Sequence, residues 1–323
     1  MFDVWPGPKP SAIAPSTAAL LSVVFTIVYV LPFYLSSATR PSPHLTRDAP
    51  SSIRARVRAV TSSTILSTVL TVCVLHQVGH LPPARILRLL GLWPVSLLDS
   101  ARTLLLVATL FTGPLFEYGL VDGHWKDWVT GREVYQTLSS WTGYRNYVAG
   151  PVSEEIIWRA LIIPIHIMAG VSGKRIVFLT PLYFGIAHVH HLYEFRLTNP
   201  QTPFIIAVIR SLFQFTYTSL FGFFAAFVFV RTGNLYSVIL AHSFCNWMGL
   251  PRVYGRVGVQ AGEPIGPPVT GDGRTRDPPI QAHGISWTLA YYALLVAGAV
   301  GFYYQLFPLT ESSYALPVVL REE

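Results

Sequence analysis

The sequence places two adjacent carboxylates and an arginine in a strongly apolar stretch, Pro151-Val-Ser-Glu-Glu-Ile-Ile-Trp-Arg159. Ionisable groups are costly inside a membrane, so each such group is a functional candidate. On an α-helix, Glu155 and Arg159 share a face at i,i+4 and are expected to pair. Glu154 is rotated about 100° from Glu155 and is therefore predicted to remain available as a base. Ser153 is predicted to cap this helix.

Two other apolar stretches carry groups suited to orienting water or stabilising a negative charge. His188 follows Phe184 by four residues, and Asn246 follows His242 by four. Side chains at i,i+4 project from one face of a helix, so His242 and Asn246 can converge on one oxygen. Together with Glu154, these groups are suited to acyl transfer to water: the carboxylate takes a proton from water, a histidine assists, and fixed donors stabilise the oxyanion.

The motifs of two common hydrolase classes are absent from the sequence. It contains no GxSxG and no HExxH, so it predicts neither a serine nucleophile elbow nor a zincin helix. The spacing of Arg210 and Gln214 favours a structural or headgroup contact. Cys73 and Cys245 lie in apolar segments without CxxC spacing and are interpreted as small buried side chains.

The elements that must position these groups are membrane helices. Only 12% of the residues are charged, about half the roughly 25% of a typical soluble domain. Asp, Glu, Lys and Arg are missing from five windows of at least 20 residues, namely 10–39, 59–84, 211–230, 232–251 and 278–310. Roughly 20 apolar residues span a bilayer, so we predict an all-α polytopic membrane protein. We expect about eight membrane helices, near residues 17–38, 59–77, 97–116, 151–169, 176–191, 204–230, 233–250 and 285–307.

The basic residues indicate an orientation in the membrane rather than a nucleic-acid partner. The net charge is +7, but the cations lie mainly in short loops between apolar segments, where they orient membrane proteins. If the N-terminus lies outside the cytosol, 13 cations fall in cytosolic loops and 8 on the other side. That orientation places Glu154, His188, His242 and Asn246 together in the cytosolic half of the bilayer.

Three ordered motifs resemble those of a known family. EExxxR (Glu154, Glu155, Arg159), FxxxH (Phe184, His188) and HxxxN (His242, Asn246) are similar to the motifs of the type II CAAX prenyl endopeptidases. The longer strings RNYVAGPVSEE and FGIAHVHHLYE resemble the eukaryotic branch of the CAAX protease and bacteriocin-processing family. The resemblance covers roughly residues 84–250.

This resemblance implies an eight-helix intramembrane glutamate protease of the endoplasmic reticulum, with its active site accessible from the cytosol. Such an enzyme removes the last three residues of a CaaX protein after its cysteine is prenylated. The implied partners are the lipid bilayer and farnesylated or geranylgeranylated proteins such as small GTPases; no cofactor, metal or nucleic acid is expected. The resemblance makes Glu154 the general base, His188 its helper in activating water, and His242 with Asn246 the oxyanion site. Structural support is assigned to Glu155, Arg159 and Phe184.

The expected organisation is a single membrane protease domain over residues 1–323. Its catalytic core covers 84–250, and the Gly- and Pro-rich segment 251–281 is expected to form a flexible loop. Three alternatives remain open at this point: a zinc protease with Glu154, His188 and His242 as ligands, a proton-coupled transporter, and a non-catalytic scaffold.

Overall fold

The computed structural model describes residues 12–42, 46–258 and 283–318, and this part of the chain is helical without a β-strand. The predicted all-α class is confirmed. Most of the predicted loop 251–281 lies outside the described residues. The α-helices are α1 (Pro15–Val30), α2 (Pro32–Leu35), α3 (Pro50–Cys73), α4 (Pro83–Leu89), α5 (Leu97–Leu110), α6 (Thr112–Phe116), α7 (Trp125–Thr130), α8 (Arg132–Ser139), α9 (Trp141–Tyr144), α10 (Gly150–Glu155), α11 (Ile162–Met168), α12 (Gly173–Ala187), α13 (His190–Thr198), α14 (Phe204–Thr232), α15 (Leu235–Met248) and α16 (Ile285–Leu309). Short π-helical segments occupy η1 (Val74–Val78), η2 (Glu117–Val121), η3 (Arg145–Ala149) and η4 (Ile156–Leu161).

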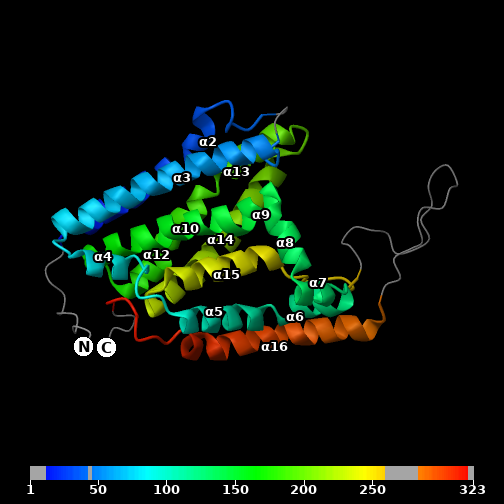
Figure 1. Ribbon diagram of the computed structural model, residues 1–323. Coiled ribbons are helices and arrows are strands. Elements are labelled where there is room, and N and C mark those ends of the chain that lie inside the picture. Colours follow the sequence, from blue (N-terminus) through cyan, green and yellow to red (C-terminus); the bar gives the residue numbers. More distant parts are fainter. Residues whose placement is uncertain (1–11, 43–45, 259–282, 319–323) are drawn as a thin grey trace.

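The helices form layers around a central group. Helices α3 and α13 lie along one side, and α5 and α16 lie along the opposite side (Figure 1). Between them run α10, α14 and α15, and α12 contacts α14. The three sequence motifs therefore lie on inner helices, flanked by helices with more exposed apolar surface.

The described residues include four helices that are long and apolar enough to cross a membrane: Pro15–Leu35, Pro50–Val78, Phe204–Thr232 and Ile285–Leu309. The pair Leu97–Leu110 and Thr112–Val121 is bent by 80° and makes a fifth if it forms one span. A polytopic membrane protein is thus confirmed, whereas the predicted count of about eight is not. Of the other three predicted spans, two correspond to the short helices α12 (15 residues) and α15 (14 residues). The third lies in a longer helical run that carries Glu154, Glu155 and Arg159 within the predicted span.

Local sequence signals explain where the helix that carries the third motif begins. Gly233 adopts a left-handed conformation (φ 55°) and ends α14, a position that favours glycine because it lacks a Cβ. Asn234 then caps α15, since its side-chain oxygen accepts hydrogen bonds from the backbone amides of Tyr236 and Ser237. The Asn234 amide also donates to the Ser96 carbonyl at 2.7 Å, which ties the start of α15 to α5.

The first motif lies inside a helical run rather than at its start. Residues 141–168 are continuously helical, with π-helical geometry in η3 and η4 on either side of α10. The predicted cap at Ser153 is wrong for that reason. Its hydroxyl donates back to the Ala149 carbonyl at 2.7 Å and lies 3.0 Å from the Tyr29 hydroxyl. Single π-helical turns within α-helices are frequent at functional sites.

Close backbone approach holds α12, which carries the second motif, against α14. A Cβ built on Gly222 would lie 2.7 Å from Pro181 Cβ, and one on Gly185 would lie 2.3 Å from Ser219 Oγ. Small residues at such crossings let the helix backbones approach closely. The crossing of α12 and α14 fixes the position of His188 at the end of α12.

Gly222→Ala is expected to reduce the free energy of unfolding by roughly 1–3 kcal/mol, the usual cost of overpacking. The added methyl group would meet the rigid ring of Pro181, so α12 and α14 must move apart. The melting temperature of the purified protein in detergent measures this effect. Gly284→Ala is the matched control, because its nearest atom is Ser286 Oγ at an ordinary 3.6 Å; an equal loss in both variants would contradict the prediction.

Candidate active site

Glu155 is the centre of a buried polar network. Its Oε1 accepts a hydrogen bond from Arg159 Nη1 at 3.0 Å and lies 2.7 Å from His242 Nδ1. The Glu155 side chain is fully buried, and the Arg159 side chain is 1% exposed. The i,i+4 pair therefore forms as the spacing predicts, and the same carboxylate also orients a histidine 87 residues away.

The Arg159 guanidinium lies between two aromatic rings. Its Cζ is 4.8 Å from the centroid of Phe184 and 5.6 Å from that of Phe221. Cation–π attraction stabilises a guanidinium that has been removed from water. Phe184, for which a supporting role at the site is predicted, also contacts the His188 ring edge-on.

Glu154 lies on a different side of the helix from Glu155 and lines a cavity. Its side chain is 20% exposed, against 0% for Glu155. Glu154 Oε2 lies 3.6 Å from His242 Nε2. His242 is thus held between the two carboxylates: Nδ1 donates to Glu155, and Nε2 faces Glu154.

His188 also lines this cavity, and its ring orientation is fixed by the backbone. Its Nδ1 is 2.8 Å from the Phe184 carbonyl. A carbonyl oxygen only accepts hydrogen bonds, so Nδ1 carries the proton, and in the neutral ring Nε2 is the basic nitrogen. His188 can therefore accept a proton through Nε2.

Asn246 lines the cavity next to a residue that the sequence motifs do not include. Its amide nitrogen donates to the Asn146 carbonyl at 3.0 Å, and Ser243 Oγ donates to the Tyr147 carbonyl at 2.8 Å. Both carbonyls belong to η3, so two hydrogen bonds join α15 to the segment before Glu154. Asn146 lies within the string RNYVAGPVSEE, and this string is the sequence feature that could have indicated its place at the site.

The cavity itself has a volume of about 780 Å³ and brings together the four predicted catalytic residues, Glu154, His188, His242 and Asn246. Its wall includes apolar side chains from the α5, α14 and α16 side: Val107, Leu110, Phe111, Leu220, Phe224 and Phe302. A different part of its wall carries arginines and histidines from the α3, η3 and α13 side: Arg47, Arg56, Arg145, His190 and His191. The three motifs, which lie on different inner helices, therefore share one cavity.

Comparison with known proteins identifies the family. The family model described as type II CAAX prenyl endopeptidase Rce1-like matches residues 136–248. The chain is 36% identical over 242 residues to the probable CAAX prenyl protease 2 of Schizosaccharomyces pombe, covering 74% of this chain and 83% of that protein. It is 36% identical over 247 residues to CAAX prenyl protease 2 of Homo sapiens, covering 71% of each. The chain belongs to the type II CAAX prenyl endopeptidase family.

This CAAX prenyl endopeptidase family member is therefore a protease, and thus a hydrolase. CAAX prenyl protease 2 of Saccharomyces cerevisiae is 28% identical over 257 residues, covering 72% of this chain and 79% of that protein. No solved structure matches the chain. The matched segment 136–248 contains all three motifs and most of the residues that line the cavity.

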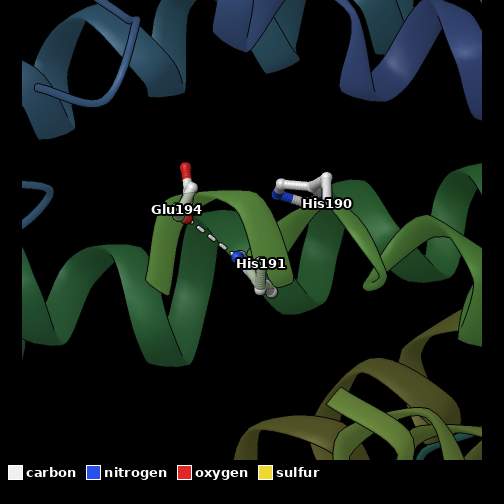
Figure 2. Close-up of side chains that lie close together, drawn as sticks. All are labelled: His190, His191 and Glu194. Atoms are coloured by element: carbon white, nitrogen blue, oxygen red, sulfur yellow. Dashed lines mark hydrogen bonds and ion pairs between the residues drawn. The ribbon is translucent and has the colours of Figure 1, made fainter. Parts of the chain in front are cut away.

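A second polar cluster of the CAAX endopeptidase lies on α13 and consists of His190, His191 and Glu194 (Figure 2); its two histidines line the same cavity. His191 Nδ1 lies 2.8 Å from Glu194 Oε2, and Arg56 Nη2 lies 2.8 Å from Glu194 Oε1. Burial alone would raise the pKa of Glu194, but the His191 hydrogen bond and the charge of Arg56 outweigh it and lower this pKa to about 2. The ionised Glu194 therefore joins α13 to α3.

Among the described residues, His190, His191 and Glu194 form the group of three whose potential ligand atoms all lie within 4.8 Å of one another. This donor set fits a metal ion poorly, because Arg56, and Arg47 at 3.8 Å, already balance the charge of its one carboxylate. Glu154, His188 and His242 do not form such a group in the described part of the chain. The cluster on α13 is better explained as an ion-pair contact that holds α13 against α3.

Proposed function

We propose that this protease removes the C-terminal tripeptide from prenylated CaaX proteins, with Glu154 activating the attacking water. The observation that carries the proposal is the position of Glu154: it is a partly exposed carboxylate in the same cavity as His188, His242 and Asn246. The curated relatives, which are named CAAX prenyl protease 2, support the substrate class.

The shape and lining of the cavity suit a substrate with one apolar and one polar part. Val107, Phe111 and Phe302 offer an apolar wall near α5 and α16 for an isoprenoid chain. The α3 and η3 side carries cations for a peptide tail. Ligand sites are typically concave and mainly apolar, with a few polar groups that fix orientation.

In the proposed mechanism, water bound between Glu154 and His188 attacks the carbonyl carbon of the prenylated cysteine. Glu154 takes the water proton as general base, and His188 Nε2 helps orient the water. Asn246 donates to the oxyanion, and so does His242 Nε2 when the ring carries a proton on both nitrogens, with Nδ1 donating to Glu155. The C–N bond then breaks, and the proton passes to the amine of the departing tripeptide.

The geometry favours this mechanism over zinc coordination by Glu154, His188 and His242. His242 Nδ1 is held by Glu155 and its Nε2 lies near Glu154, but His188 does not join them within ligand distance. A role as proton-coupled carrier has no specific observation in its favour. We further propose that the enzyme resides in the endoplasmic reticulum membrane with its cavity open to the cytosol, since the distribution of cationic loops supports that orientation.

Farnesylated CaaX peptide is expected to be cleaved after the modified cysteine, whereas the unprenylated peptide should be cleaved poorly. The lipid contributes about 0.8 kcal/mol per buried CH₂ group and holds the tail at membrane depth. The test incubates the purified protein with each peptide, with and without a strong chelator, and detects the released tripeptide by mass spectrometry. Equal cleavage of both peptides would contradict the substrate class, and chelator-sensitive cleavage restored by zinc would contradict the carboxylate mechanism.

A further inference from the structure

The cavity of this membrane protease carries an uneven distribution of charge. Among the described residues that line it are three arginines, Arg47, Arg56 and Arg145, but one carboxylate, Glu154. Arg56 is occupied, because it binds Glu194 at 2.8 Å and donates to the Thr39 carbonyl at 2.9 Å. Arg145 is placed differently, because it lies in the same helical run as Glu154.

Arg145 is held in position but keeps donor capacity. Its Nε donates to Asn146 Oδ1 at 2.9 Å, and its Nη1 donates to Asp48 Oδ1 at 2.8 Å and to the Arg47 carbonyl at 3.1 Å. These hydrogen bonds involve Nε and Nη1, so Nη2 can still donate to another acceptor. Asp48 is 61% exposed, and exposed ion pairs contribute little energy, so a second carboxylate can compete for this guanidinium.

The distance from Arg145 to Glu154 along the helical run exceeds the length of the peptide product by a few ångströms, which the long side chain of Arg145 can span. The two residues are nine positions apart in a continuous helical run. At the α-helical rise of about 1.5 Å per residue this corresponds to at most roughly 13 Å along the axis, because η3 is π-helical and rises less per residue. A fully extended tripeptide spans at most about 10–11 Å. With the scissile carbonyl at Glu154, the free carboxylate of the third residue would lie within the range of the Arg145 side chain, which lines the same cavity.

We propose that Arg145 binds the C-terminal carboxylate of the CaaX tail and thereby measures three residues from the scissile bond. This inference rests on the proposed function and adds a specificity-determining residue to it. A guanidinium binds a carboxylate through two parallel, charge-assisted hydrogen bonds, which gives direction as well as attraction. The contact also explains why a protease with an open cavity selects the end of a chain.

The test compares a farnesylated CaaX peptide with the same peptide ending in a carboxamide. The full-length protein in detergent is expected to cleave the acid roughly 10- to 100-fold faster in kcat/KM, the effect of one hydrogen bond to a charged group. Arg145→Gln is expected to lower this acid-to-amide ratio to near one, and Arg145→Lys to keep part of it. Both substrates are measured with the same protein preparation. The acid-to-amide ratio is therefore independent of the folded fraction, even where a variant is less stable.

Two variants serve as controls for charge and for position. Arg54→Gln removes an exposed arginine that stacks on Trp141 outside the cavity and is expected to keep the wild-type ratio. Asp48→Asn removes the ion pair of Arg145 and is also expected to keep it. The proposal is overturned if the wild-type protein cleaves acid and amide equally, if Arg145→Gln keeps the ratio, or if Asp48→Asn loses it. If neither farnesylated peptide is cleaved, the proposed function itself fails.

Discussion

Glu154→Gln is expected to abolish measurable tripeptide release while leaving the protein folded. Glutamine keeps the size of the side chain and some of its hydrogen bonding, but it cannot take a proton from water. General base catalysis contributes typically 10²–10⁴-fold to the rate, so kcat should fall by at least about that range. Glu154 is not part of the Glu155–Arg159 pair, so the melting temperature should change little.

The measurement pairs single-turnover tripeptide release with thermal unfolding in detergent and with binding of a farnesylated peptide. Glu311→Gln, a change of the same kind at an exposed position, is the matched control. Retained turnover in Glu154→Gln, or unfolding of this variant alone, would show that Glu154 is not the base.

Glu155→Gln is expected to have the opposite profile, with a large loss of stability. This substitution leaves the buried guanidinium of Arg159 without its counter-charge. Breaking a buried ion pair by removing one partner costs roughly 3–5 kcal/mol. We expect a clearly lower melting temperature or a lower yield of folded protein.

The double variant Glu155→Gln, Arg159→Met separates stability from catalysis. It leaves neither charge buried, so part of the lost stability should return. Activity should remain low, because His242 Nδ1 would then meet a neutral amide in place of a carboxylate, and that carboxylate orients the imidazole. A double variant with recovered stability and wild-type turnover would contradict the orienting role of Glu155.

Features that depend on composition and on neighbours along one helix could be predicted from the sequence. The scarcity of charge over long windows indicated membrane helices, because a bilayer tolerates few ionisable groups. The i,i+4 spacing of Glu155 and Arg159 predicted their pairing, which the structure shows at 3.0 Å. The three motifs by themselves indicated the family that the comparisons show.

Contacts between helices required the tertiary structure. The bond from His242 to Glu155 and the one from Asn246 to Asn146 join residues 87 and 100 positions apart. No local period encodes these pairings, because they depend on how α15 lies against η3 and α10. The spacing of the third motif suggested two donors on one face, but it gave no indication that Glu155 holds one of them.

The predicted number of spans and the predicted cap at Ser153 show the same limit. Hydropathy marks apolar segments, but it does not distinguish a helix that crosses the bilayer from a shorter one enclosed by other helices. The helical run 141–168 begins upstream of the first motif and contains two π-helical segments, so Ser153 lies inside it. The sequence by itself determined which groups are available for chemistry. Only the packing of the helices decided which of them share a cavity, because that depends on side chains far apart in the chain filling common space.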